Sequence, residues 1–429
     1  MQNWTRQTER RAYVHSDGNI SGLGCEKPLK PASERPLNLC ELSERFKFSE
    51  ETLGELLPVY GSELEAVIRA LKSPGKRYYV RVSTLRTTPE KVRTRLAGRG
   101  FDVSQHELIP EALWVPIRGP FEVPARPKKV MVDKFTAESV LQGANVYAPG
   151  IARCNKIRIS DSVNIIDDEG ETLASGIARM NETQILTFRK GLAVEVTESK
   201  YRVPSFRETP EYQEGLIYPQ SLPAIVTSRV LDPKPNEVIL DMTCSPGGKL
   251  SHISQLMENQ GRVIGVDRNR RKTEETMETC TRLGCSNVTL FVHDSRYLSS
   301  DFSTLKPDKI LVDPPCSALG IMPKVYEYAP KSEIEALARY QKQFLEEASK
   351  IVKPGGRIVY SVCTLTLQEC ERNALHASTN CNLSIQAQSP MLGDRAIPID
   401  NGSTEQCQRF HPHKHGAGFF IACFKRHTQ

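Results

Sequence analysis

Short apolar runs that alternate with helix-like segments constrain the fold of this chain more than any other feature. After Pro235 these runs are rich in Val, Ile and Leu, and they cover residues 238–241, 262–267, 288–294, 309–313 and 357–362. Continuous apolar runs of this length are typical of parallel strands that are buried on both faces. Their alternation with helices predicts an α/β domain in which helices cover both faces of a doubly wound parallel sheet.

A glycine-rich loop follows the first of these strands. Asp241 leads into Met-Thr-Cys-Ser-Pro-Gly-Gly-Lys, which ends at Lys249. Two adjacent glycines after a first strand allow a ligand to approach the backbone closely. The spacing differs from the Gly-x-Gly-x-x-Gly fingerprint, which disfavours a dinucleotide. S-adenosylmethionine carries no phosphate and needs only a tight turn, so the loop favours that cofactor.

Acidic residues end the next two strands. Asp267 ends the run 262–267, and Asp294 ends the run 288–294. An acid at the end of the second strand can accept hydrogen bonds from ribose hydroxyls, and Asp294 is placed to meet an adenine amino group. The alternative is that each acid caps the helix that follows it. Three acids at successive strand ends behind a Gly-Gly loop favour a nucleoside cofactor.

Two cysteines follow the remaining strands of the run pattern. Asp313 is followed by Pro-Pro-Cys316-Ser, and the run 357–362 leads directly into Cys363. A helical segment separates the two strands, so they form one right-handed βαβ unit. Cys316 and Cys363 therefore emerge at the carboxyl ends of neighbouring parallel strands, where ligands bind in open α/β sheets. A lone buried cysteine is usually an inert small hydrophobe, but this pair beside a cofactor loop predicts an active site.

The chain before this sheet divides into three predicted segments. Residues 1–45 carry scattered Gly, Pro and Ser without a period, which is typical of a loosely ordered extension. Residues 46–125 contain apolar positions at helical spacing and then a small strand–helix–strand piece. Residues 126–204 contain short β-type runs between turn signals, namely 156–159, 162–166, 185–186 and 193–196. That pattern predicts a small β-barrel, after which the sheet domain takes residues 205–429.

Composition excludes several classes of protein. No apolar run approaches the ~18 residues that span a bilayer, and the first residues lack the apolar core of a signal peptide, so we expect a cytoplasmic protein with no membrane partner. We expect its twelve cysteines to be reduced. No Cys-x-x-Cys pair occurs and no cysteines flank His411-Pro-His413-Lys-His415, so we expect no metal. The net charge of +6 only mildly favours a polyanionic partner.

Several segments resemble the NSUN (Sun-domain) family of RNA cytosine-5 methyltransferases. They are DMTCSPGGK (241–249), DPPCS (313–317) and SVCT (361–364), with RFHPH and GFFIA near the C-terminus. RYYVRVSTLRTTPEKV (77–92) is similar to the partial RRM-like subdomain that precedes the catalytic core in that family. The stretches 143–151, 157–170 and 189–196 look like an RNA-binding PUA domain, whose insertion marks the sixth NSUN type and its archaeal relatives. The resemblance implies a Rossmann-like methyltransferase sheet, preceded by the RRM-like subdomain with an inserted PUA pseudobarrel.

The resemblance also implies roles for individual residues. Cys363 corresponds to the nucleophile, whose thiolate adds to carbon 6 of cytosine so that carbon 5 can take the methyl group. Cys316 corresponds to the second cysteine, which assists product release. From the residues themselves, we expect Asp313, once protonated, to donate to ring N3 and Lys249 to orient Asp313. The implied cofactor pocket consists of Thr243, Cys244, Ser245, Pro246, Gly247, Gly248, Lys249, Asp267, Asp294 and Asp313.

The inserted PUA domain implies a substrate. Members of the sixth NSUN type methylate cytosine 72 in the tRNA acceptor stem, and their PUA domain binds the CCA end. A base at the end of a stem is easily unstacked, which favours an enzyme that must bury it beside a cysteine. The implied contacts to the terminal nucleotides are Gly143, Ala144, Asn145 and Tyr147, although Tyr147 can equally serve barrel packing. We expect the protein to act as a monomer.

The chain departs from the family pattern at three places. It has Thr243-Cys-Ser where the family usually has Cys-Ala-Ala, Pro314 in place of Ala, and Val362 in place of Thr. None of these changes removes a group that the mechanism requires. Two alternatives stay open: an amino-methyltransferase, because Asp313-Pro-Pro-Cys316 resembles a D-P-P-Y loop, and a non-catalytic tRNA-binding protein that retains the fold.

Overall fold

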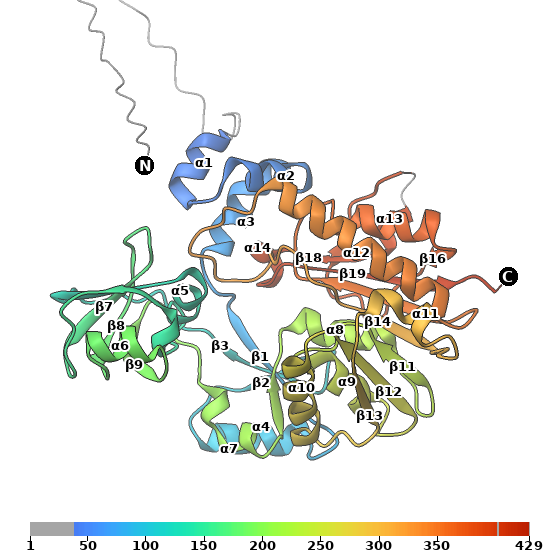
Figure 1. The fold of residues 1–429 in the computed structure, drawn as a ribbon, viewed down its shortest axis with the longest axis horizontal. Coiled ribbons are helices and arrows are strands. Elements are labelled where there is room, and N and C mark those ends of the chain that lie inside the picture. The colour runs from blue at the N-terminus through green and yellow to red at the C-terminus, as the bar shows by residue number, and fades with distance from the viewer. Residues whose placement is uncertain (1–37, 401–402, 429) are drawn as a thin grey trace, which may run out of the picture. The chain divides into compact units, whose positions relative to one another are not determined.

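Three β-sheets organise residues 38–400 and 403–428, the part of the chain that the computed structural model describes (Figure 1). The largest has nine strands, in the order β13-β12-β11-β14-β15-β19-β18-β17, with β16 paired to β19. Its strands are β11 (Val238–Asp241), β12 (Arg262–Asp267), β13 (Val288–Val292), β14 (Lys309–Val312), β15 (Arg357–Val362), β16 (Leu383–Ile385), β17 (Asp394–Arg395), β18 (Gln408–Phe410) and β19 (Phe419–Arg426).

The first five strands of this order run parallel, as predicted. β11 pairs with β12 on one side and with β14 on the other, so the strand order reverses at β11. A reversal of this kind opens a crevice at the carboxyl ends of the strands. The parallel part of the sheet ends at β15, because all of β15 pairs antiparallel with β19 on its other side.

Helices cover both faces of this sheet, and the alternation of side chains along each strand decides which residues meet which helices. Ile310, Ile358 and Tyr360 point into the core formed with α12 (Lys331–Ile351) and α13 (Glu371–Asn380). Ile239 and Val359 point into the opposite core. The helices on that side are α8 (Leu222–Leu231), α9 (Gly248–Leu256) and α10 (Arg270–Arg282). The doubly wound α/β prediction is therefore confirmed.

A four-stranded sheet lies in the N-terminal part of the chain, in the order β10-β1-β3-β2. Its strands are β1 (Arg77–Val82), β2 (Ser104–Gln105), β3 (Ala112–Pro116) and β10 (Ile217–Pro219), and it is accompanied by α4 (Pro89–Gly98) and α7 (Pro210–Gln213). β10 and Phe206 belong to this sheet and its core, although the predicted domain limit at 205 separates them from it. Although these residues follow the barrel in the chain, pairing of β10 with β1 places them in the N-terminal sheet.

Helices precede this sheet. They are α1 (Leu39–Phe46), α2 (Glu50–Tyr60) and α3 (Leu64–Leu71). The predicted loose extension over residues 1–45 is thus wrong for residues 39–45, while residues 1–37 lie outside the described part. α1 has an amphipathic face, because Leu42 and Phe46 lie one turn apart and are both buried.

The six-stranded sheet forms the predicted barrel, in the order β5-β9-β8-β7-β4-β6. Its strands are β4 (Lys128–Val132), β5 (Val146–Tyr147), β6 (Ile151–Cys154), β7 (Ser162–Ile166), β8 (Thr172–Ala178) and β9 (Leu192–Ser199), and its helices are α5 (Lys134–Val140) and α6 (Glu182–Phe188). Two predicted strands are wrong. Residues 185–186 lie in α6, which a capping box of Asn181 and Gln184 starts. Residues 156–159 form a loop between two left-handed residues, Lys156 and Ser160.

A loop from the large sheet's domain completes the barrel core. Val325 lies in the loop between β14 and α12, is almost fully buried and packs among the barrel's apolar side chains. Lys134 of α5 forms an ion pair with Glu327 of the same loop, at 2.9 Å. The loop that carries Cys316 therefore continues into the barrel. Among the described helices, none combines the length and the apolar character that crossing a bilayer requires.

A buried ion pair joins β18 to the segment after Cys363. Arg409 and Glu371 are both fully buried, and the Arg409 Nε donates to Glu371 Oε1 at 2.9 Å. Arg409 Nη1 also donates to the Leu365 carbonyl at 2.7 Å. The guanidinium thus connects the C-terminal RFHPH segment to the start of α13 and to the loop that joins β15 to α13.

We predict that Glu371→Leu destabilises the protein by about 3–5 kcal/mol, because the charge of Arg409 stays buried without its partner. Denaturant unfolding followed by circular dichroism measures the change. The control is Glu275→Leu, which removes the exposed Arg271–Glu275 pair and should change the stability by less than about 1 kcal/mol. Equal effects of the two substitutions would contradict the role of the buried pair.

Candidate active site

Cys316 and Cys363 meet at the carboxyl edge of the large sheet. Cys363 directly follows β15, and Cys316 lies in the loop that follows β14. The two strands are parallel neighbours, and the two Sγ atoms are 3.4 Å apart. The predicted meeting of the two sulfur atoms is confirmed. Both side chains are partly buried, with Cys316 against the core that includes α12 and Cys363 against the opposite core.

Asp313 and Lys249 lie beside this pair. The Lys249 Nζ contacts Asp313 Oδ2 at 2.6 Å, and the Ser361 hydroxyl donates to the other carboxylate oxygen at 2.7 Å. Burial lowers the pKa of Lys249, but the adjacent Asp313 carboxylate outweighs it and the net pKa is raised. Lys249 therefore carries a positive charge, and it holds Asp313 in one orientation.

The two thiols differ in their acidity. A hydrogen bond from Cys316 lowers the pKa of Cys363 below its ordinary value, although burial and Asp313 oppose this effect; Lys249 lowers it further. The same hydrogen bond raises the pKa of Cys316, and burial raises it further. Since the thiolate is the nucleophilic form of cysteine, the site favours Cys363 as the attacking sulfur.

The glycine-rich loop forms one wall of a small cavity next to these residues. Gly247 has φ 96°, a left-handed conformation, and it precedes α9. A Cβ on Gly248 would lie 2.8 Å from Cε1 of Tyr218, so the turn admits no larger residue there. The cavity is lined by Tyr218, Gln220, Ala224, Asp241, Thr243, Cys244, Ser245, Pro246, Gly248, Lys249 and Asp313. Apart from Gly247, the whole predicted loop Thr243–Lys249 reaches this cavity.

The cavity has the polar character that a nucleoside cofactor needs. Gln220 is largely buried, and its Nε2 has no hydrogen-bond partner among the described residues. A ligand oxygen would satisfy that donor. Asp241 is buried at the end of β11, and burial raises its pKa to about 7. The residues present therefore fit S-adenosylmethionine, whose amino and carboxylate groups need both acceptors and donors.

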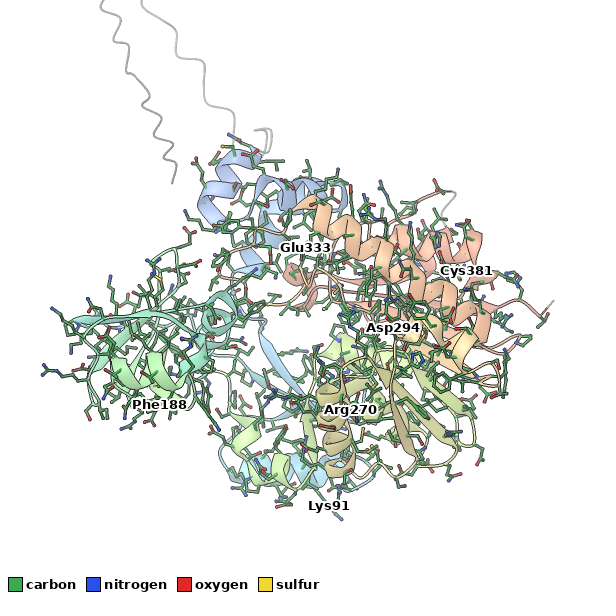
Figure 2. All side chains as sticks on the ribbon, viewed as in Figure 1. Lys91, Phe188, Arg270, Asp294, Glu333 and Cys381 are labelled. Carbon is green, nitrogen blue, oxygen red and sulfur yellow. The ribbon has the colours of Figure 1, made fainter. Side chains whose placement is uncertain are left out.

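Asp267 ends β12, as predicted, whereas Asp294 lies two residues beyond the end of β13, and neither acid lines this cavity. Asp267 Oδ1 accepts from the Asn269 backbone at 2.9 Å. Asp294, labelled in Figure 2, accepts from the Arg296 backbone and forms an ion pair with its guanidinium at 2.6 Å. The hydrogen bonds from Arg296 lower the pKa of Asp294. Asp294 thus caps the turn 295–297, as the alternative from the sequence has it, whereas α10 is capped by Asn269 and Asp267 contacts the backbone N–H of that residue.

The four residues predicted to contact RNA have different environments in the barrel. Asn145 accepts a hydrogen bond from the Val196 backbone at 2.9 Å, and Gly143 takes φ 97° beside Ser199. The Ala144 backbone donates to the Ser139 carbonyl at 3.2 Å. Tyr147 is 58% exposed on β5, so barrel packing does not account for its ring. Other large apolar side chains exposed on this domain are Phe135, Ile159, Leu186 and Phe188, the last labelled in Figure 2.

The histidine tract forms a short helix, α14 (Pro412–His415). His411 Nδ1 lies 3.3 Å from the Tyr60 hydroxyl, and the His411 backbone donates to His415 Nδ1. Within residues 38–400 and 403–428 no group of three metal-binding side chains occurs. The tract therefore connects the C-terminal strands to α2.

Sequence reasoning missed two buried residues of this region. Gln220 lines the cavity, and Glu369 accepts hydrogen bonds from the loops of both cysteines. Gln220 follows an ordinary strand and Glu369 lies in a polar loop, so neither has a local spacing that marks it.

Comparison with known proteins agrees with this geometry. Residues 228–425 match the family described as 16S rRNA methyltransferase RsmB/F, and residues 128–199 match the PUA domain. The chain is 40% identical over 369 residues to a tRNA (cytosine(72)-C(5))-methyltransferase of Pyrococcus horikoshii, a match that covers 85% of this chain and 93% of the relative. It is 31% identical over 394 residues to tRNA (cytosine(72)-C(5))-methyltransferase NSUN6 of Mus musculus, covering 82% of each.

A solved structure is also similar. The crystal structure of NSun6 from Pyrococcus horikoshii with SFG, an analogue of S-adenosylmethionine, superposes with a TM-score of 0.82 at 38% identity. The match covers 90% of this chain and 99% of that one. It therefore includes the large sheet and the two smaller ones.

We predict that Lys249→Met shifts the reaction of Cys363 with iodoacetamide to higher pH. The positive charge of Lys249 lowers the pKa of Cys363, so its removal raises that pKa and leaves less thiolate near neutral pH. A rise of one pKa unit slows labelling about tenfold below the pKa. Mass spectrometry of the Cys363 peptide over a pH series measures the shift. Lys350→Met, at an exposed position, is the control, and an unchanged profile in Lys249→Met would contradict the prediction.

Proposed function

Because the chain belongs to the NSUN6-like family of RNA cytosine-5 methyltransferases, we propose that it methylates carbon 5 of cytosine 72 in the tRNA acceptor stem. The observation that supports this most directly is the 3.4 Å separation of the Cys316 and Cys363 sulfur atoms beside the Lys249–Asp313 pair. Carbon 5 of cytosine is too poor a nucleophile to take a methyl group unless a thiolate first adds to carbon 6.

The proposed reaction begins at Cys363. Its thiolate forms a bond to carbon 6, while Asp313, once it has taken up a proton from water, donates that proton to N3 and stabilises the adduct. Lys249 holds Asp313 toward the ring. S-adenosylmethionine, when bound, supplies a methyl group on a sulfonium centre, which carbon 5 of the adduct attacks. A base then removes the carbon 5 proton, the sulfur–carbon 6 bond breaks, and N3 returns its proton.

Cys316 acts at two points in this scheme. Its Sγ lies 3.4 Å from that of Cys363, so as a thiol it can donate to the Cys363 thiolate before the attack. After methyl transfer it assists release of the product by elimination of Cys363. The proposed cofactor pocket comprises the loop Thr243–Lys249 with Asp267, Asp294 and Asp313.

The two alternatives lose their support. Direct transfer to an exocyclic amino group needs no thiol, so the paired sulfur atoms would have no role in an amino-methyltransferase. A protein that only bound tRNA would have no use for a lysine–carboxylate pair oriented beside a cysteine whose pKa the neighbouring Cys316 lowers.

The substrate side of the proposal rests on the PUA domain. We propose that this domain binds the CCA end, with the exposed ring of Tyr147 and the segment 143–145 as contacts. We also propose that the protein acts as a cytoplasmic monomer. The proposed domains are residues 46–125, 126–204 and 205–429, with β10 serving the sheet of the first.

We predict that Cys363→Ala abolishes methylation and that Cys316→Ala lets a covalent enzyme–RNA adduct accumulate. Bisulfite sequencing of a treated tRNA transcript should show 5-methylcytosine at position 72 with the wild-type protein only. A denaturing gel should show the shifted adduct band with Cys316→Ala only. A shifted band with Cys363→Ala instead would mean that the two roles are exchanged, and methylation by Cys363→Ala would refute the proposed chemistry.

We predict that Tyr147→Ala raises KM for tRNA at least fivefold and changes kcat little, because stacking of a base on an aromatic ring is worth about 1–3 kcal/mol. A tRNA without its CCA nucleotides is the control. It should bind the wild-type protein more weakly and show no further loss with Tyr147→Ala. An additional loss of the same size would place the contact of Tyr147 elsewhere on the RNA.

A further inference from the structure

Glu369 lies between the two cysteine loops and is fully buried. It sits after β15, in the segment that leads from Cys363 to α13. Its carboxylate accepts hydrogen bonds from Ser317 N at 2.9 Å, Ser317 Oγ at 2.5 Å, Gln341 Nε2 at 2.9 Å, Thr364 Oγ1 at 3.1 Å and Thr366 Oγ1 at 3.2 Å. Ser317 is the neighbour of Cys316, and Thr364 is the neighbour of Cys363. One side chain therefore connects both loops.

The groups that donate to the Glu369 carboxylate are all neutral: a backbone N–H, hydroxyls and an amide. Such donors suit a carboxylate, and none of them compensates its charge. The negative charge is thus held in a region of low dielectric, where it acts strongly on nearby ionisable groups.

Opposite charges consequently flank the sulfur pair. On one side Lys249 favours the thiolate of Cys363. On the other side Glu369 disfavours a thiolate on Cys316, in addition to the larger effects of the hydrogen bond to Cys363 and of burial, and the pKa of Cys316 is raised. Two thiolates at 3.4 Å would repel each other, so only one of the two sulfur atoms ionises.

The other titratable groups around Glu369 do not compete for this proton. Tyr360 donates to the Glu369 carbonyl at 2.6 Å, and Cys370 follows in the chain. Burial raises the pKa of both well above their ordinary values, so they stay neutral. Glu371 is paired with Arg409. Asp313 faces Cys363 and is paired with Lys249.

We infer that Glu369 is a positioning residue that keeps Cys316 protonated, so that the thiolate forms on Cys363 and Cys316 remains its hydrogen-bond donor. The inference rests on the proposed function in that Cys363 is taken as the attacking sulfur. In this role Glu369 determines which of two chemically identical thiols loses its proton. A thiolate on Cys316 would leave Cys363 protonated and unable to add to carbon 6.

The test compares the wild-type chain with Glu369→Gln, which keeps the size of the side chain and removes its charge. Each protein, without RNA or methyl donor, is treated briefly with iodoacetamide over a pH series. Mass spectrometry then measures the labelled fractions of Cys316 and Cys363. We expect Cys363 to be labelled first in the wild-type protein, and the ratio of Cys316 to Cys363 labelling to rise about tenfold in Glu369→Gln, as a relative shift of one pKa unit produces.

Two further variants separate charge from structure. Thr366→Val removes the two hydrogen bonds between the Thr366 hydroxyl and Glu369 and leaves the carboxylate, so the labelling ratio should stay within about twofold of the wild-type value. Glu369→Asp keeps the charge and should preserve Cys363 as the first site of labelling. If Glu369→Gln does not fold, as judged by circular dichroism, the Glu369→Asp result decides: preserved selectivity supports the inference, and lost selectivity overturns it.

Other outcomes also overturn the inference. Preferential labelling of Cys316 in the wild-type protein does so, and so does an unchanged ratio in folded Glu369→Gln. Neither result depends on catalysis, because no RNA is present. A wild-type protein that labels as expected but does not methylate cytosine 72 would instead contradict the proposed function alone.

Discussion

The parallel pairing of β14 with β15 determines the distance between two sulfur atoms, and the rest of the site depends on that distance. Neighbouring strands in a sheet lie about 4.8 Å apart, so residues that leave equivalent strand ends are brought close together. Cys363 leaves β15 directly, and Cys316 reaches it through a loop held by Gln341 of α12. A backbone hydrogen bond also connects the two cysteine loops, since Gly320 N donates to the Cys363 carbonyl at 2.9 Å. The chemistry thus depends on the register of two strands and on two loops that cannot move apart.

Charged groups around this pair are buried, which disfavours folding unless each is compensated. The site compensates them in different ways. Arg409 and Glu371 neutralise each other, and Lys249 and Asp313 do so next to the reacting position. Glu369 is compensated only by neutral donors, so its field extends to the sulfur atoms. The paired Glu371 therefore stabilises the fold, whereas the unpaired charge of Glu369 also affects the ionisation of the neighbouring cysteines.

Local sequence patterns predict the parts of this protein whose structure is decided locally. The apolar runs identify the parallel strands, and the residues that follow them identify the site, because a strand end is a fixed place in an α/β sheet. Residues 185–186 were predicted as a strand because two apolar residues cannot distinguish a strand from a helix, whereas the capping box that decides the matter precedes them. β10, Gln220 and Glu369 could not be predicted, since each acquires its role from partners far away in the chain: β1, the cofactor cavity and the Cys316 loop.

The position of Val325 has a consequence for how the chain unfolds. The PUA domain is inserted in the chain between β3 and β10, two strands of one sheet. This topology alone would allow the domain to fold and unfold independently. Val325 prevents that, because the catalytic loop places this side chain inside the barrel's own core. Melting the barrel would expose Val325 to water and free the loop behind Cys316. The RNA-binding module and the chemical centre are therefore expected to lose their structure in one cooperative step.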